Sequence, residues 1–151
     1  MQAAVVIREM QTGDADAVSG LLLELGHPAD AATVGANLRL IQTLSPLHAA
    51  FVAVKSRSIA GVISTFATPV LHRPHPIGRI SILVVTDSLT GQGTGTALLL
   101  RVEEFLRNLG CDRIEVTSAA HRLQTHEFYR RRGYVQQGVR FVREFEGRNA
   151  A

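Results

Sequence analysis

The stretch Ile80-Ser81-Ile82-Leu83-Val84-Val85-Thr86-Asp87-Ser88-Leu89-Thr90-Gly91-Gln92-Gly93-Thr94-Gly95-Thr96-Ala97 determines how the rest of the sequence is interpreted. Its first six residues are aliphatic apart from one serine and predict a buried strand. Three glycines follow, and a helical apolar pattern begins directly after them. Glycines let backbone N–H groups converge, and a helix that begins there directs its positive end at the same point. The turn is therefore suited to bind phosphate.

This turn differs from two well-known glycine-rich phosphate loops. No Lys-Ser or Lys-Thr pair follows its glycines, so it does not match the loop of P-loop nucleoside triphosphatases. Leu98 stands where the dinucleotide-binding fingerprint needs its third glycine. The alternative is a tight connection between a strand and a helix without any ligand, so a second motif is needed to decide.

The sequence on both sides of the turn predicts a mixed α/β domain with the element order βααβββαβαβ. After the turn, we expect a long helix that ends at Gly110 and buries Leu98, Val102, Phe105 and Leu109. We then expect a strand at 112–117, a short helix at 125–132 and a last, alternating strand at 134–145. Before the turn, we expect a strand at 3–9, a helix starting at Thr12-Gly13-Asp14, a helix capped by Thr33 and stopped by Ser45-Pro46, and a hairpin of 48–54 and 59–68.

The composition is that of one folded domain. The chain has 151 residues, of which 46% are hydrophobic and 19% charged, and it contains no repeat or flexible linker. We therefore expect a single domain over residues 1–151. No apolar run is long enough to span a membrane, and Arg8 and Glu9 interrupt the first apolar stretch, so we expect a cytoplasmic protein. The single cysteine, Cys111, excludes an intrachain disulfide and a cysteine-based metal site, and no metal is expected.

The net charge of +3 at pH 7 comes from the C-terminal half of the chain. Its densest cluster is Arg130-Arg131-Arg132. We interpret this cluster as a solvated helix face near an anionic small molecule rather than a nucleic-acid surface, because few aromatic side chains are available to stack on bases. Nucleic acid is therefore not an expected partner.

A second motif supports the phosphate interpretation of the glycine-rich turn. It is the run Thr117-Ser118-Ala119-Ala120-His121-Arg122-Leu123-Gln124-Thr125-His126-Glu127-Phe128-Tyr129-Arg130-Arg131-Arg132-Gly133-Tyr134. A strand, a glycine-rich turn, a long helix, a second strand and then Phe-Tyr-x-x-x-Gly-Tyr resemble the GNAT superfamily of acetyl-CoA-dependent N-acetyltransferases. The specific motifs cover residues 80–134, and the order of the N-terminal elements is similar as well.

The resemblance implies a fold, a donor and a set of site residues. The fold is a single GNAT-like domain with a central, mostly antiparallel, splayed sheet flanked by helices, and the donor is acetyl-CoA. Tyr129 is implied to protonate the departing thiolate, which suits a phenol whose ordinary pKa is near 10. The residues implied to bind acetyl-CoA are Leu83, Val84 and Val85 along the pantetheine arm, Thr90, Gly91, Gln92, Gly93, Thr94, Gly95 and Thr96 at the pyrophosphate, and Arg122.

Two departures from the family pattern concern the turn and the strand before it. The turn begins with Thr90 where the family usually has Gln or Arg, so one phosphate contact is lost. A similar subgroup that acts on aminoalkylphosphonates and related small amines reads Gly-Glu-Ile-x-Glu on the strand, whereas this chain reads Gly78-Arg79-Ile80-Ser81-Ile82. Both carboxylates are absent, and the general base is left unassigned among His72, His75 and a water held by Ser81.

The expected function is transfer of an acetyl group to a primary amine by direct attack in a ternary complex. Positive side chains near the strand favour a small zwitterionic or anionic acceptor over a polyamine. The residues expected on the acceptor side are His72, Arg79, Ser81 and His126. The alternative is a degenerate, non-catalytic module that binds acyl-CoA. No membrane partner is expected, and a homodimer is an expectation from similar proteins alone.

Overall fold

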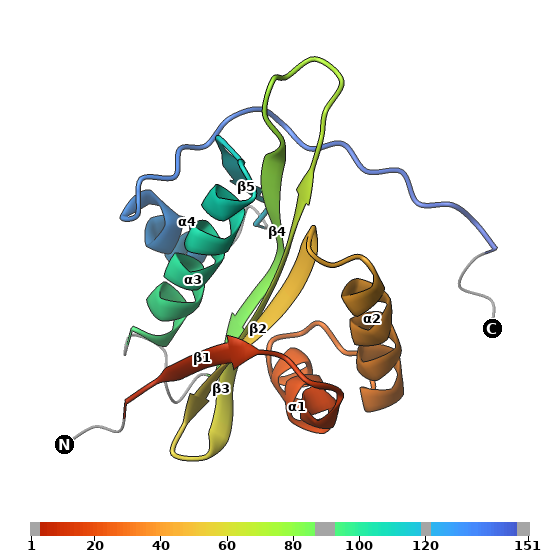
Figure 1. The fold of residues 1–151 in the computed structure, drawn as a ribbon. Helices are drawn as coiled ribbons and strands as arrows, with labels where there is room; N and C mark the ends of the chain where they lie inside the picture. Colours follow the sequence, from red (N-terminus) through yellow and green to blue (C-terminus); the bar gives the residue numbers. More distant parts are fainter. Residues whose placement is uncertain (1–3, 87–92, 119–121, 148–151) are drawn as a thin grey trace. The chain divides into compact units, whose positions relative to one another are not determined.

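The computed structural model describes residues 4–86, 93–118 and 122–147. The chain divides into two compact units, Met1–Thr117 and Ser118–Ala151. The elements of the first unit are β1 (Val6–Glu9), the 3-10 turn η1 (Thr12–Asp14), α1 (Ala15–Glu24), α2 (Ala31–Thr43), β2 (His48–Lys55), β3 (Ser58–Thr68), β4 (Ile77–Val85), α3 (Thr94–Asn108) and β5 (Ile114–Val116) (Figure 1). The second unit contains α4 (Leu123–Arg130).

The first unit is built on a five-stranded sheet in the order β1-β2-β3-β4-β5. The first four strands are antiparallel to their neighbours, and β5 runs parallel to β4. Helices α1 and α2 pack on one face of the sheet and α3 packs on the other (Figure 1). This arrangement confirms the predicted α/β class and the mostly antiparallel sheet. Within the residues that the structure describes, no helix has both the length and the apolar character needed to cross a lipid bilayer.

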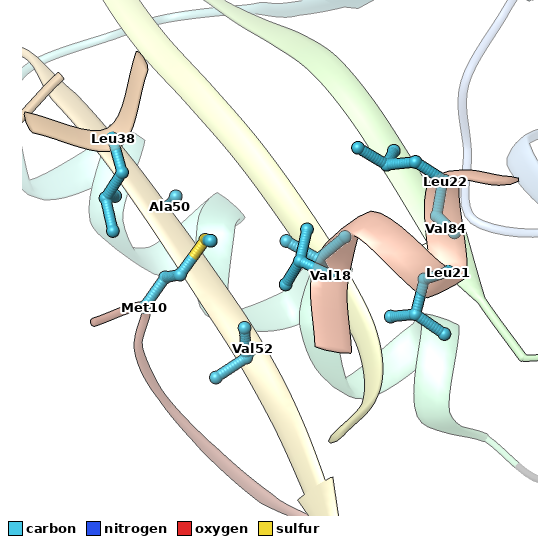
Figure 2. Close-up of a cluster of buried hydrophobic side chains, with 9 residues drawn as sticks. Met10, Val18, Leu21, Leu22, Leu38, Ala50, Val52 and Val84 are labelled. Carbon is cyan, nitrogen blue, oxygen red and sulfur yellow. The ribbon is translucent and has the colours of Figure 1, made fainter. Parts of the chain in front are cut away.

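One hydrophobic cluster joins α1 and α2 to the sheet. Its members come from the segment after β1, from both helices and from three strands, and they are Met10, Val18, Leu21, Leu22, Leu38, Ala50, Val52, Val62 and Val84 (Figure 2). Burial of one such aliphatic side chain stabilises a fold by about 1.5–3 kcal/mol. Val84 is the member that β4 contributes. The side chain of Val84 therefore anchors in this cluster the strand expected to bind the cofactor.

The opposite face of the sheet packs against α3. The fully buried hydrophobic residues of α3 are Leu98, Leu99, Val102 and Leu106, whereas Phe105 and the C-cap residue Leu109 are half-buried. The predicted stripe was therefore correct in two positions and rotated in the other two. The buried face is rotated toward Leu99 and Leu106, because the side of α3 that packs on β2, β3 and β4 is set by the tertiary contacts.

Polar contacts fix the entry to α1 and α2. Asp14 accepts two hydrogen bonds from Arg8, of 2.8 and 2.9 Å, and one of 2.8 Å from the backbone N–H of Gln11. The Arg8 guanidinium holds the pKa of the Asp14 carboxyl below its usual range. The predicted cap of the second helix, Thr33, was wrong by one turn. The Asp30 carboxylate caps α2 by accepting a hydrogen bond of 2.7 Å from the N–H of Thr33. A carboxylate at this position also interacts favourably with the helix dipole.

A two-residue turn connects β2 to β3. Ser56 and Arg57 both adopt positive φ values, of 51° and 66°. Consecutive positive φ values give the turn whose twist matches that of a hairpin. The predicted hairpin is confirmed, and its strands extend by one residue at each side of the turn to Lys55 and Ser58.

The last predicted strand is not formed. Residues 134–147 follow α4 without regular structure, and Val135, Val139, Phe141, Val142 and Phe145 are all exposed. An alternating pattern produces a strand only where a neighbouring strand supplies backbone hydrogen-bond partners, and residues 134–147 pair with no strand in the described part of the chain. The order βααβββαβαβ is therefore correct up to α4 and wrong in its final element.

The close approach of β4 to α3 depends on Gly78. A Cβ atom on Gly78 would lie 2.5 Å from Cδ1 of the fully buried Leu106. We expect Gly78→Ala to lower the free energy of unfolding by about 1–3 kcal/mol, measured by urea denaturation. The cost should shrink in the background Leu106→Ala, which removes the obstructing atoms.

The matched control for this prediction is Gly20→Ala in α1, where a Cβ meets nothing within 4 Å. There the substitution should raise stability by about 0.5–1 kcal/mol, because alanine favours the helix. Strictly additive effects of Gly78→Ala and Leu106→Ala would contradict the packing argument.

Candidate functional site

Strand β4 has a complete partner on one side and a short partner on the other. It pairs with β3 along its whole length, from Ile77 opposite Thr68 to Val85 opposite Gly61. It pairs with β5 only at Gly78, Arg79 and Ile80. Within the described residues, the backbone from Ser81 to Val85 therefore has an open edge on the β5 side. An open edge presents N–H and C=O groups that an extended, amide-containing ligand can pair with.

A bulge lies where this open edge begins. Thr65 pairs with Ile80 and Ser64 pairs with Ile82, so Ser81 is the extra residue of β4. A bulge bends the strand and increases its local twist. Leu83, Val84 and Val85, which sequence analysis assigned to the pantetheine arm, lie on the open edge just beyond it. The bulge was not foreseen because Ser81 fits an alternating strand pattern as well as its neighbours do.

Helix α3 begins close to this edge in sequence, and the start of the helix has the features of an anion site. Gly93 is the N-cap with φ of 84°, and Thr94, Gly95 and Thr96 form the first turn. The first N–H groups of a helix have no partner within the helix. Thr94 is 1% exposed, and its Oγ1 has no hydrogen-bond partner in the described part of the chain. The remaining predicted cradle residues, Thr90, Gly91 and Gln92, lie outside the described residues.

The observed features fit the group that the sequence analysis assigned to this place. A pyrophosphate needs several N–H or O–H donors, and the unpartnered hydroxyl of Thr94 and the first turn of α3 are such donors. An amide-containing arm needs a strand edge, which β4 offers from Ser81 to Val85. Both features belong to the first unit of the chain.

Arg79 lies on the same face of the sheet as α1 and α2, in an ion-pair network. Its Nη1 is 2.9 Å from Oε1 of Glu115, and its Nη2 donates a 3.2 Å hydrogen bond to the Thr117 hydroxyl. The second carboxylate oxygen of Glu115 is 3.3 Å from Nε of Arg113. The side chains of Arg79 and Glu115 are 35% and 34% exposed, so solvent and small molecules reach both.

The sequence motifs pointed to Arg79 but not to Glu115 or Arg113. Residues 113–117 read as a strand, and their acidic and basic members carried no motif. The parallel register of β4 and β5, with Arg79 opposite Glu115, brings the three side chains together. Nothing in the sequence specified that register.

A pair of hydroxyl groups extends the polar surface toward the bulge. Ser64 Oγ and Ser81 Oγ are 2.7 Å apart, and Ser81 Oγ also donates a hydrogen bond of 3.1 Å to the backbone carbonyl of Ser64. Ser64 lies two residues before Phe66, which pairs with Arg79 in the ladder, so the hydroxyl pair and Arg79 share one face of the sheet. The structure thus brings together two of the predicted acceptor-side residues, Arg79 and Ser81.

The histidines of the proline-rich loop are placed differently. His72 and His75 are exposed between β3 and β4. Their neighbour Arg73 forms a 3.3 Å ion pair with Asp112, just before β5. Half-buried Cys111 is adjacent to Asp112, and burial together with that charge raises the pKa of its thiol. A raised pKa disfavours the thiolate and agrees with a structural role for Cys111.

The second unit contains the predicted acid and two further predicted residues. Tyr129 in α4 is 7% exposed, and its ring contacts those of Phe128 and Tyr134 at centroid distances of 5.2 and 5.3 Å. Burial raises the pKa of Tyr129 to about 12, so its phenol is protonated at neutral pH. Arg122 is the N-cap of α4, and His126 lies half-buried on that helix.

The arginine run at the end of α4 is only partly a solvated face. Arg130 is exposed, as predicted, and Arg131 forms an exposed 3.2 Å ion pair with Glu127. Arg132 is half-buried, because its guanidinium lies 3.9 Å from the centre of the Phe128 ring. Its Nη1 also donates a hydrogen bond of 2.7 Å to the Phe128 carbonyl. Arg132 therefore stabilises the end of the helix instead of facing water.

Comparison with known proteins identifies the enzyme class. Residues 25–134 match the family described as "Acetyltransferase (GNAT) family". Over 142 residues the chain is 32% identical to the aminoalkylphosphonate N-acetyltransferase of Salmonella typhimurium, covering 91% of this chain and 89% of that protein. The protein is therefore an N-acetyltransferase that uses acetyl-CoA as its donor and an amine as its acceptor. It belongs to the GNAT family of acetyltransferases.

Solved structures share the fold at lower sequence identity. A transcriptional regulator from Bacillus halodurans C-125 superposes with a TM-score of 0.86 at 20% identity, covering 94% of this chain and 100% of that one. A GNAT family acetyltransferase from Staphylococcus aureus superposes with a TM-score of 0.77 at 22% identity, covering 96% and 100%. These similarities confirm the predicted fold.

The raised pKa of Tyr129 gives a spectroscopic prediction. The chain has two tyrosines, so Tyr134→Phe leaves Tyr129 as the only phenol. Absorbance at the tyrosinate band should then rise with a midpoint near pH 12 instead of near 10. Because the folded-state pKa lies above the unfolded one, the contribution of Tyr129 to stability is complete below pH 10 and is lost as the pH rises to about 12.

Circular dichroism at each pH serves as the control for unfolding, and Tyr129→Phe is the matched variant. A midpoint near 10 in Tyr134→Phe with an unchanged circular dichroism spectrum would show that Tyr129 is not buried.

Proposed function

We propose that the acceptor is a small primary amine that also carries an acidic group, such as a phosphonate or a carboxylate. The observation that carries this proposal is the pair of guanidinium groups, Arg79 and Arg113, on a single carboxylate, Glu115. The three charges sum to +1 beside the open edge of β4. An acidic group on the acceptor can form charge-assisted hydrogen bonds there, each worth about 1.5–3 kcal/mol.

The relative of known activity supports the same acceptor class. It is an aminoalkylphosphonate N-acetyltransferase and matches 91% of this chain. An aminoalkylphosphonate combines an amine with a strongly acidic group. A polyamine has no acidic group, and its additional positive charges would be repelled by Arg79 and Arg113.

For the donor, we propose the residues selected from the sequence. The backbone of Leu83, Val84 and Val85 would pair with the pantetheine arm along the open edge of β4, and Arg122 would contact the same ligand. The N–H groups of residues 91–96 would hold the pyrophosphate, with Thr94 adding its hydroxyl. Acetyl-CoA supplies the thioester carbonyl that the amine attacks. The protein's main contribution is to hold amine and thioester in a reactive orientation.

We propose that Tyr129 donates the proton to the departing thiolate. A general acid must be protonated before it acts; a phenol with its ordinary pKa near 10 is protonated at neutral pH, and burial raises the pKa of Tyr129 further. The direct transfer needs no covalent enzyme intermediate.

On the acceptor side, the geometry supports Ser81 over His72. The hydroxyl of Ser81 is held by Ser64 and shares a face with Arg79, whereas His72 lies on an exposed loop. A water bound to Ser81 would relay the proton of the ammonium to solvent. His126 remains a proposal from the sequence motif.

The acceptor class is tested by steady-state kinetics. Thiol release from acetyl-CoA should show kcat/KM for an aminoalkylphosphonate more than tenfold above that for spermidine and above that for an alkylamine of equal chain length. Arg79→Glu should reverse the preference, because it removes the anion-binding charge and creates a cation-binding one.

Faster acetylation of spermidine by the unaltered enzyme would overturn the acceptor proposal. So would a ranking of acceptors that Arg79→Glu leaves unchanged.

The donor site is tested by Thr94→Val, which removes one hydroxyl at nearly constant volume. Without ligand, the variant should be as stable as the parent or more stable, because the buried Thr94 hydroxyl has no partner among the described residues and such a hydroxyl is costly. With acetyl-CoA, the increase in Tm should be smaller than for the parent, because one ligand contact is lost.

The control is Thr65→Val. Thr65 is about as buried as Thr94, but its hydroxyl has a partner, because it donates a hydrogen bond of 2.6 Å to the carbonyl of Arg79. Thr65→Val should lower stability and leave the ligand-induced shift intact. An unchanged shift in Thr94→Val would remove Thr94 from the donor site.

A further inference from the structure

We propose that Glu115 binds the ammonium end of the acceptor, so that Glu115 and Arg79 together receive a zwitterion with its two charges in a fixed order. This inference rests on the proposed acceptor class and adds a residue to it. The acceptor's ammonium would face the Glu115 carboxylate, and its acidic group would face the guanidinium groups of Arg79 and Arg113. Glu115 would thus determine specificity by contacting the amine itself.

Glu115 lies close to the open edge of β4, which is the first argument for its role. Arg79 and Glu115 are opposite each other in the parallel ladder, one residue before its last pair, Ile80 and Val116. The open edge of β4 begins at the next residue, Ser81. An acceptor held between the two side chains therefore lies within two residues of the edge proposed for the donor. All these groups belong to the first unit of the chain.

The distribution of carboxylates carries the second step. Among the described residues of the five strands, the acidic side chains are Glu9 and Glu115. Glu9 lies on β1 and Glu115 on β5, which are the opposite edges of the sheet. Strand β4 has no carboxylate of its own. Glu115 is therefore the strand carboxylate on the side of the sheet where β4 is open.

The balance of charge carries the third step. Glu115 shares its two oxygens between two guanidinium groups, at 2.9 and 3.3 Å. Each carboxylate oxygen has a second lone pair, so Glu115 can accept further hydrogen bonds without releasing either arginine. A primary amine is an ammonium ion at neutral pH, because its ordinary pKa is near 10. A bound zwitterion would then complete an array of three positive groups, Arg79, Arg113 and the ammonium, and two negative groups, Glu115 and the acidic group.

The alternative explanation is structural: the Arg79–Glu115 pair only holds the short strand β5 against β4. Both explanations predict harm from breaking the pair. They differ for a variant that keeps an ion pair but exchanges its two ends. They also differ in which acceptors are affected by each single substitution.

The experiment measures kcat, KM and acetyl-CoA affinity for the full chain with two acceptors, an aminoalkylphosphonate and an alkylamine of equal length. Glu115→Gln should raise KM for both acceptors by about tenfold or more, because both contain the ammonium group. Arg79→Gln should raise KM for the aminoalkylphosphonate alone. Acetyl-CoA affinity, measured by calorimetry, should not change in either variant.

The exchanged variant Arg79→Glu/Glu115→Arg separates the two explanations. It should recover the Tm of the parent while the aminoalkylphosphonate is still used poorly. Recovery of both Tm and kcat/KM would overturn the proposal in favour of a structural pair. Asp112→Asn is the matched control, since it removes a 3.3 Å ion pair with Arg73 at the same end of the sheet and should leave KM unchanged.

The remaining outcomes distinguish this inference from the proposed function. If the parent enzyme prefers spermidine, the acceptor proposal fails first. If it prefers the aminoalkylphosphonate and Glu115→Gln has normal KM values, only the role of Glu115 fails. If Glu115→Gln does not fold, the Tm and kcat/KM of the exchanged variant test the role of Glu115. If the exchanged variant does not fold, the KM values of Glu115→Gln test it.

Discussion

The unequal pairing of β4 is the constraint on which the rest of the site depends. The strand, nine residues long, pairs with β3 from Ile77 to Val85. It pairs with β5 at three residues only. The bulge at Ser81 separates the region with two neighbours from the region with one. If β5 continued alongside β4, its backbone would occupy the groups that an amide-containing arm can use. In the donor site that we propose, the pantetheine arm would bind a strand that is firmly held on one side only.

Both faces of the sheet hold β4 in this position. On one face Val84 belongs to the cluster formed with α1 and α2, and on the other Gly78 allows Leu106 of α3 to approach closely. A strand with an open edge depends on such packing, because it lacks one set of ladder hydrogen bonds. The core therefore does more than stabilise the domain: it holds an incompletely paired strand in place on both faces of the sheet.

Electrostatics give the acceptor side its character. Strand β4 carries a cation at position 79 where the similar subgroup has a carboxylate, and the structure supplies Glu115 from the neighbouring strand. Arg79 forms an ion pair with Glu115, a contact that the sequence did not predict. A paired arginine beside a second arginine still leaves an excess positive charge, and in our proposal the partner carboxylate binds the ammonium ion. Under the acceptor proposal such a site would favour zwitterions, since an ion of one sign alone would leave one of its two halves unmatched.

The sequence by itself determined the fold class, the family, the donor and the order of elements through α4. These follow from local patterns, such as the aliphatic run 80–85, the glycines at 91, 93 and 95, and Phe-Tyr-x-x-x-Gly-Tyr. Only the tertiary structure decided the cap of α2, the bulge at Ser81, the buried face of α3, the lack of a strand after α4 and the meeting of Arg79 with Glu115. The physical reason is that each of these depends on a partner distant in sequence or on a choice between near-equivalent local options. Register above all is set by the whole sheet, and a shift of one residue would have sent Glu115 to the other face.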